Sequence, residues 1–210
     1  MTELGAGSIF RVALVRGRHG EVVCKRLRAR MRDEPAALRA LHREQHVLGC
    51  SPHAQVPRLL QRGDDAAGPF LLQTRPAGVA LRVLVEAFVA REAALPGGLL
   101  LALARNAFAL LAQLHRQSRV VGLVHGDMNP DHLLVTPAGE VAFIDFGQAR
   151  WRDMPALLLG DERGTLPYTS PEVARGVRAP GQADDVFALA ASVAFAVLGG
   201  PPCGARDATS

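Results

Sequence analysis

The chain has 210 residues, of which 49% are hydrophobic and 21% charged, so it is long enough to bury a core and is not a disordered protein. Its net charge is +4, but Lys25 is the only lysine among 24 basic residues, and this bias is typical of coding composition rather than of a nucleic-acid-binding surface. The cysteines at 24, 50 and 203 show no paired spacing, so we expect a reducing cytoplasm and no disulfides.

The first third of the chain predicts a β-rich region with one helix. Two β-rich runs, 9–15 and 21–27, flank a glycine-containing turn and indicate a hairpin. Apolar residues at helical spacing after Pro35 predict a helix over 34–48. Two further strands are expected near 56–62 and 69–74.

The sequence predicts that the rest of the chain is mainly helical. The Pro76-Ala77-Gly78 stretch is the best candidate for a linker. The runs Leu99–His115 and Val186–Leu198 are apolar on nearly all sides, so we expect both helices to lie inside protein. The longest apolar stretch, Val186–Leu198, is too short to cross a bilayer, so we expect no membrane association.

The residues with chemical potential are concentrated between 123 and 147. Two short apolar strands there each lead into a loop with an aspartate, Asp127 and Asp145. Aspartates are common in turns, but one carboxylate that accepts a proton and another that holds a metal would need the same pattern. The spacing alone leaves both interpretations open.

The motifs around these aspartates show a family resemblance. His125-Gly126-Asp127 resembles the catalytic loop of protein kinases, and Asp145-Phe146-Gly147 resembles their D-F-G motif. Further motifs follow in the family's order at 4–12, 22–25, 41–48, 69–78, 164–172 and 184–190. The resemblance implies an α+β, two-lobed, protein kinase-like fold, with an N-lobe over 1–75 and a C-terminally short C-lobe over 76–210.

The resemblance gives a reason for the solitary lysine. A compact ammonium on a flexible stem can lie between phosphate oxygens and a carboxylate, whereas the wide guanidinium of arginine does not fit that slot. Lys25 is therefore expected to contact ATP, with Glu44 of the predicted helix as its partner.

The remaining ATP contacts are also implied by the resemblance. Backbone N–H groups at Gly5, Ala6, Gly7 and Ser8 would approach the phosphates, although Phe10 stands where the family has its third glycine. Val12 would cover the adenine, and the backbone from Thr74 to Pro76 would face its edge. The expected cofactor-binding side chains and hinge residues are Val12, Val23, Lys25, Thr74, Arg75, Pro76, Leu134 and Asp145.

The catalytic loop departs from the family pattern. Asp127 would accept or orient the proton of the attacking hydroxyl, with Thr165 bridging toward it, and Asp145 would hold Mg²⁺, or Mn²⁺ in its place. Asn129 stands where serine/threonine kinases have a lysine. His132 occupies the position of the metal-binding asparagine, where an imidazole should weaken a second magnesium site or suit a softer ion.

Regulation by phosphorylation is not expected. Gly126 replaces the arginine that clamps a phosphorylated activation loop in the family, and no Ser, Thr or Tyr occurs between Gly147 and Gly164. The acceptor and its clamp are absent together. An active site with this sequence should be assembled constitutively or controlled by a partner.

The function implied by the resemblance is transfer of the γ-phosphate of ATP to a protein hydroxyl by a serine/threonine kinase. The segment 164–172, with Ser170-Pro171-Glu172 as its expected anchor, favours a protein substrate. Two alternatives remain: a pseudokinase that binds nucleotide without turnover, and a small-molecule kinase of the aminoglycoside phosphotransferase type. The family usually continues beyond the helix at 186–198, so we expect an exposed apolar patch there, covered by a partner or in a homodimer.

Overall fold

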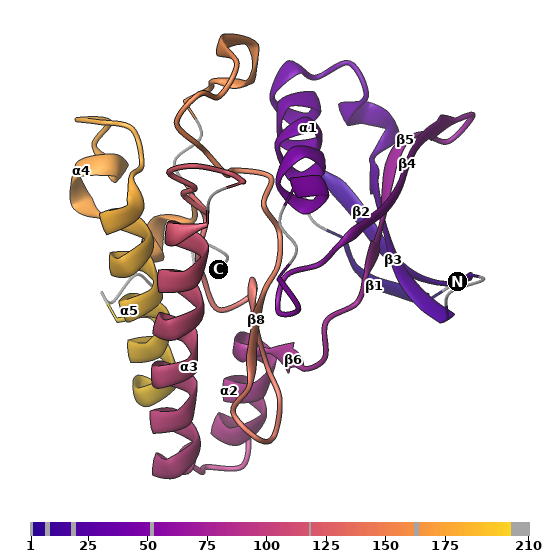
Figure 1. Ribbon diagram of the computed structural model, residues 1–210. Coiled ribbons are helices and arrows are strands. Elements are labelled where there is room, and N and C mark those ends of the chain that lie inside the picture. The colour runs from indigo at the N-terminus through magenta and orange to yellow at the C-terminus, as the bar shows by residue number, and fades with distance from the viewer. Residues whose placement is uncertain are drawn as a thin grey trace.

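The computed structural model describes residues 2–6, 9–17, 20–50, 53–117, 119–161 and 164–202. Two lobes lie side by side (Figure 1), a smaller one built on an antiparallel sheet with one long helix and a larger one that is mainly helical. The α+β, two-lobed architecture that the sequence predicted is therefore confirmed.

The smaller lobe contains a five-stranded antiparallel sheet in the order β1-β2-β3-β5-β4. The predicted hairpin is present, with Gly17 opposite Gly20 at its end. The fourth strand begins at Leu59 rather than at 56, because Pro57 has no N–H to donate to a ladder. The sequence analysis did not predict the first strand, because it interpreted Gly5 and Ala6 as part of a phosphate-binding loop. The strands are β1 (Thr2–Ala6), β2 (Phe10–Gly17), β3 (Gly20–Leu27), β4 (Leu59–Asp65) and β5 (Gly68–Thr74).

Helix α1 (Pro35–Cys50) connects the two lobes. It starts at a proline, whose missing N–H costs nothing in the first turn, and it continues through Gly49, which we expected to end it. Ala37 and Leu41 pack into the core of the smaller lobe, while Val47 and Leu48 join the core of the larger lobe. A rigid element thus ties the β-sheet to the helical half of the molecule.

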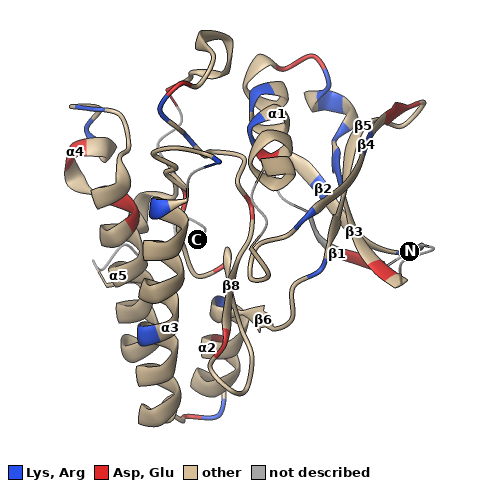
Figure 2. Ribbon diagram, viewed as in Figure 1, with Lys and Arg blue, Asp and Glu red and all other residues tan. Residues whose placement is uncertain are grey.

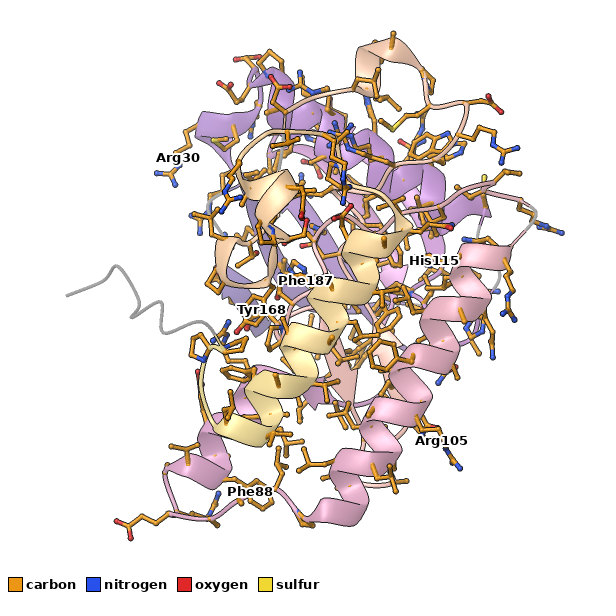
Figure 3. All side chains as sticks on the ribbon, turned by 90° about the vertical axis from the view of Figure 1, so that its left-hand side faces the viewer. Arg30, Phe88, Arg105, His115, Tyr168 and Phe187 are labelled. Atoms are coloured by element: carbon orange, nitrogen blue, oxygen red, sulfur yellow. The ribbon has the colours of Figure 1, made fainter. Side chains whose placement is uncertain are left out.

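The larger lobe is built around α3 and α5, which lie side by side (Figures 1 and 3). A small sheet of β6, β7 and β8 carries the loops with the predicted aspartates. The short elements β6 and α2 were not predicted individually. The bounds are β6 (Val79–Ala80), α2 (Leu81–Val89), α3 (Gly97–Arg116), β7 (Leu133–Val135), β8 (Val141–Phe143), α4 (Pro171–Ala174) and α5 (Gln182–Leu198), with 3₁₀ turns η1 (Ala29–Met31), η2 (Ala156–Leu158) and η3 (Leu166–Tyr168).

The prediction that α3 and α5 are buried on all sides is wrong. Each helix buries one face, but Leu101 of α3 and Val197 and Leu198 of α5 are 60–72% exposed. Figure 2 shows few charged residues along either helix, and Phe187, labelled in Figure 3, also lies on the exposed side of α5. The apolar patch expected near the end of the chain is therefore present.

Helix α3 is the one described helix that is long and apolar enough to cross a membrane. Length and composition are weak evidence for a span, because the core helix of a globular domain satisfies the same criteria. Leu103, Leu110 and Leu114 of α3 pack in the core of the larger lobe.

Candidate active site

The centre of the site is the ammonium group of Lys25. Strand pairing places Lys25 opposite Val12, and Val23 lies two residues earlier on the same face of β3. The Nζ atom is 2.5 Å from Oε2 of Glu44 and 2.6 Å from Oδ1 of Asp145. Only 3% of the Lys25 side chain is exposed, and that of Glu44 is fully buried. The structure thus brings together three predicted site residues that are far apart in sequence.

One positive charge faces two carboxylates in this cluster. Burial by itself would lower the pKa of Lys25, but Asp145 and Glu44 together raise it above its ordinary value, so the lysine stays charged. Burial also acts to raise the pKa of Asp145, which the Lys25 ammonium instead holds well below its usual range. The carboxyl of Glu44 behaves differently from that of Asp145. Burial raises the pKa of Glu44 to about 7, although the Lys25 ammonium acts to lower it. Its other oxygen, Oε1, is buried without a hydrogen bond among the described residues.

Phe10 covers the lysine from a third side. The Lys25 Nζ atom is 4.4 Å from the centroid of the Phe10 ring, within the range of a cation–π interaction. The ring is buried and packs with Leu27 and Leu41 in the core of the smaller lobe. The residue that replaces the third glycine therefore encloses the ammonium.

The second part of the site is the loop between α3 and β7, which carries Asp127. Thr165 donates its hydroxyl to Oδ1 of Asp127 at 2.8 Å, and the amide nitrogen of Asn129 lies 3.2 Å from the same oxygen. The side-chain amide of Gln148 donates to the other oxygen, Oδ2, at 3.2 Å. Both carboxylate oxygens of Asp127 therefore accept hydrogen bonds, and Thr165 lies beside Asp127, as we expected from the sequence.

Gln148 is a site residue that the sequence analysis missed. Besides its bond to Asp127, its Oε1 accepts the backbone N–H of Gly164 at 2.9 Å. The Gln148 side chain thus connects Asp127 of the catalytic loop to Gly164 of the activation segment, which runs from Asp145 to Glu172. Only its place directly after the D-F-G motif could have drawn attention to it.

Gly126 has a structural role that the sequence did not reveal. Its φ is +80°, and a Cβ atom there would lie 2.4 Å from the carbonyl oxygen of Gln148. Any larger residue would be strained and would collide with the backbone. Glycine at this position is therefore required by the close approach of two loops, and the absence of an arginine follows from it.

The catalytic loop is anchored from below by α5. Oδ2 of Asp185 accepts the backbone N–H of His125 at 2.7 Å, and Oδ1 accepts that of Gly126 at 3.0 Å. His115 of α3 contacts the same carboxylate at 2.9 Å. Burial lowers the pKa of His125, whose Nε2 lies 3.1 Å from the carbonyl of Ile144. This contact fixes the loop of Asp127 against the loop of Asp145.

Asp145 and His132 lie between the two lobes. Asp145 has a φ of +65°, a strained conformation of the kind that is retained at functional sites. The His132 Nε2 atom lies 3.6 Å from its Oδ2. In the part of the chain that the structure describes, no group of three or more His, Cys, Asp or Glu side chains could hold a metal ion. A metal at this position would need further ligands from a bound nucleotide.

The activation segment is tied to α1 without phosphorylation. Arg43, which is fully buried, donates from Nε to the carbonyl of Leu158 at 2.8 Å and reaches the carbonyl of Gly147 at 3.5 Å. Trp151 stacks on His46 of α1 at 4.4 Å and packs against the core of the larger lobe. Arg43 was missed because its polar character gave no hint of burial.

The end of the activation segment is anchored through Ser170, the first residue of the expected anchor. Glu172, the last residue of that anchor, is exposed. Ser170 instead donates its hydroxyl to Oδ1 of Asp184 at 2.6 Å, and Arg178 binds both oxygens of the same carboxylate. Burial would raise the pKa of the Asp184 carboxyl, but its hydrogen bonds with Arg178 and Ser170 lower that pKa to about 2.

The predicted nucleotide contacts fall in three places. Gly5 and Ala6 form the end of β1, whereas Gly7 and Ser8 lie outside the described residues. Thr74 ends β5 and bonds Arg58 through its backbone N–H and its hydroxyl. The remaining expected contacts lie at the junction of the lobes: Arg75, which pairs with Glu21 at 3.5 Å, Pro76, and Leu134 on β7.

A small β-lobe and a helical lobe that meet at a buried Lys–Glu pair, with two aspartate loops facing it, define the kinase-like class of folds. A family model for the protein kinase domain matches residues 1–210. The chain therefore belongs to the protein kinase domain family.

Curated relatives of the chain are bacterial serine/threonine-protein kinases. The chain is 32% identical to PknK of Mycobacterium tuberculosis over 159 residues, which are 75% of this chain and 14% of PknK. It is 32% identical to the serine/threonine-protein kinase drp72 of Corynebacterium efficiens over 176 residues, 82% of this chain and 30% of drp72. PknA of M. tuberculosis is 38% identical over 102 residues, 47% of this chain and 23% of PknA. The chain thus spans less than a third of each of these relatives.

Proposed function

We propose that the chain is an ATP-dependent serine/threonine protein kinase domain that transfers the γ-phosphate of ATP to a protein hydroxyl. The observation that carries the proposal is the contact of buried Lys25 with buried Glu44 and with the partly exposed Asp145, opposite an Asp127 whose two carboxylate oxygens are both hydrogen-bonded. A nearly buried ammonium between two carboxylates is an arrangement suited to receiving phosphate oxygens.

Within this proposal, Asp127, Lys25 and Asn129 have different roles. Asp127 accepts the proton of, or orients, the acceptor hydroxyl, because its carboxylate is fixed by Thr165 at one oxygen and by Gln148 at the other. Lys25 holds the phosphates in line and is itself positioned by Glu44. The neutral Asn129 supplies no positive charge near the transferred phosphate, so Lys25 and any bound metal carry more of that stabilisation.

The residues present fit ATP with a divalent cation. Oδ1 of Asp145 is bound by Lys25 while Oδ2 is left without a donor among the described residues, so one carboxylate oxygen remains to hold Mg²⁺ or Mn²⁺. The cation would neutralise charge on the β- and γ-phosphates. Val12 and Val23 share the strand face of Lys25 and offer apolar cover for the adenine.

A protein acceptor is supported by the contacts that residues 164–170 make with the catalytic loop and with α5. Thr165, which contacts Asp127, is the N-cap residue of η3, and Ser170 is fixed through Asp184. The relatives named serine/threonine-protein kinases favour the same acceptor over a small molecule. We place the domain in the cytoplasm, a proposal supported by the free thiols of Cys24 and Cys50.

A partner on the larger lobe is a further part of the proposal. A groove of about 310 Å³ lies between α2 and the end of α5, and Phe88, Val89, Val197 and Leu198 line it. Exposed apolar surface of this kind is covered in stable assemblies, either by another protein or by a second copy. If a second copy covers it, light scattering of the purified chain should give a mass above the 22.3 kDa of one chain. A strictly monomeric species that also binds no dye for exposed apolar surface would contradict this part.

One observation favours a second candidate function, nucleotide binding without transfer. The Phe10 ring encloses Lys25, so an incoming triphosphate must share the ammonium with an aromatic side chain and two carboxylates. Together with the neutral Asn129, this arrangement would suit a pseudokinase.

The experiment that separates the two candidates compares the chain with Asp127→Asn, which keeps the shape of the side chain. Phosphate transfer from ATP to a generic protein, with Mg²⁺ or Mn²⁺, should fall at least about a hundredfold in the variant. ATP affinity should stay the same in both proteins. Equal transfer rates, or binding without transfer in the unmodified chain, would favour the pseudokinase.

A further inference from the structure

Two atoms with free electron pairs face each other between the lobes. Nδ1 of His132 lies 2.8 Å from the backbone carbonyl oxygen of Asp127. The amide nitrogen of Asn129 also lies 3.1 Å from Nδ1, but its two N–H groups have oxygen acceptors at 3.2 Å on Asp127 and Thr165. The contact of Nδ1 with the Asp127 carbonyl is shorter, and a carbonyl oxygen can only accept a hydrogen bond, so we assign the proton to Nδ1. In the neutral ring the lone pair is then on Nε2, and this atom lies 3.6 Å from Oδ2 of Asp145.

The second of these atoms, Oδ2 of Asp145, is positioned by the contacts of the other carboxylate oxygen. Oδ1 accepts hydrogen bonds from Lys25 at 2.6 Å and from the backbone N–H of Gly147 at 3.3 Å. Across the described residues, no hydrogen-bond donor reaches Oδ2. The separation of 3.6 Å from Nε2 is too long for a hydrogen bond between the two side chains. Two acceptors held at this separation are stabilised by a cation that both can contact.

We propose that His132 and Asp145 form a mixed nitrogen and oxygen site that selects a first-row transition-metal ion such as Mn²⁺ over Mg²⁺. This inference rests on the proposed function, because the phosphates of the bound nucleotide complete the coordination shell. Mg²⁺ is bound through oxygen ligands and water at near-ideal octahedral geometry, whereas first-row transition-metal ions also accept imidazole nitrogen. Among these ions, Mn²⁺ has the strongest preference for carboxylate and phosphate oxygens, so it suits a set with one nitrogen and several oxygens. The described residues supply only two protein ligands, so the metal binds together with the nucleotide.

The backbone carbonyl of Asp127 orients the His132 ring in this site. Metal-binding histidines commonly donate their second ring N–H to a carbonyl or carboxylate, which fixes the ring and its tautomer. The 2.8 Å contact supplies that support before any metal binds. The metal position is therefore coupled directly to the loop of the catalytic aspartate.

A direct spectroscopic test uses the protein with Mn²⁺ and the β,γ-methylene analogue of ATP, whose bridge contains no nitrogen. Electron spin-echo modulation should show coupling of Mn²⁺ to ¹⁴N in the unmodified chain and none in His132→Asn. The Mn²⁺–nucleotide complex alone controls for adenine nitrogen. His42→Gln, which removes an exposed histidine of α1, is the matched control and should keep the coupling.

Metal titration gives an independent second readout. The ratio of Mg²⁺ to Mn²⁺ dissociation constants, measured with the same analogue, should fall about tenfold or more in His132→Asn, because an amide oxygen suits Mg²⁺ better. Absence of ¹⁴N coupling, or equal ratios in the two proteins, would overturn the site. Circular dichroism checks that the variant is folded.

The outcomes for the site and for the proposed function are distinguishable. A chain that shows ¹⁴N coupling but transfers no phosphate retains the metal site and loses the kinase proposal. A chain that transfers phosphate equally well with Mg²⁺ before and after His132→Asn, without ¹⁴N coupling, is a kinase in which His132 binds no metal.

Discussion

Glu44→Gln tests the electrostatics of the Lys25 cluster most sharply. Glu44 is fully buried, and burial raises the pKa of its carboxyl from 4.5 to about 7 in the folded chain. Gln keeps an oxygen that can accept from Lys25 but cannot ionise. Its amide nitrogen would take the place of Oε1, which has no partner among the described residues, so we also expect a cost of about 1–3 kcal/mol that does not depend on pH.

The pH-dependent part follows from the direction of the pKa shift. A carboxyl with a raised pKa in the folded state binds its proton more tightly there than in the unfolded state. Its contribution to stability is complete below pH 4.5 and is lost as the pH rises to about 7. The difference between 4.5 and about 7 corresponds to about 3 kcal/mol, at roughly 1.36 kcal/mol for each factor of ten in proton affinity.

The assay is urea unfolding of both proteins between pH 4.5 and 8, without nucleotide or metal, followed by the fluorescence of Trp151, the only tryptophan. The free energy of unfolding of the original chain, relative to Glu44→Gln, should fall by about 3 kcal/mol across this range. Subtracting the variant removes the titration of other groups. Parallel profiles for the two proteins would refute the assignment of the raised pKa to Glu44.

Three other substitutions follow from the loop contacts. Gly126→Ala should destabilise the fold by at least about 1–2 kcal/mol in urea unfolding, because the left-handed backbone and the nearby Gln148 carbonyl leave no room for Cβ; unchanged stability would refute the close approach. Gln148→Met should lower the transfer rate about ten- to a hundredfold at unchanged ATP affinity, since Asp127 loses the donor at Oδ2, and a change in affinity alone would contradict this role. Arg43→Met should cost about 1–3 kcal/mol in urea unfolding, as the buried carbonyl of Leu158 loses its donor; a neutral effect would count against the clamp.

The residues at the centre of the site could be predicted from the sequence. Lys25 broke the arginine bias at the position where a point charge is needed, and Glu44 lay at the edge of an apolar helical stripe. Asp127 and Asp145 followed short apolar strands in the right order. These signals are local or depend on motif order, and the structure brings all four residues to the junction of the lobes.

The contacts that hold the site could not be predicted in the same way. Gln148 and Arg43 act through backbone groups of distant segments, and no local pattern marks a polar side chain that folding buries. The sequence analysis noted at Gly126 only that the arginine of the family is missing. The positive φ of Gly126 and its closeness to the Gln148 carbonyl explain why a glycine is there. The exposed side of α3 was missed because an apolar helix surface looks the same in sequence whether it is covered or not, whereas the exposed patch at the end of α5 was expected.

The identity of the phosphorylated group tests the central claim most directly. After incubation of the chain with ATP, a divalent metal and a mixture of proteins, mass spectrometry should find phosphoserine or phosphothreonine that is absent with Asp127→Asn. Phosphate found only as free inorganic phosphate or on small molecules, or in equal amounts on protein with both chains, would contradict the account.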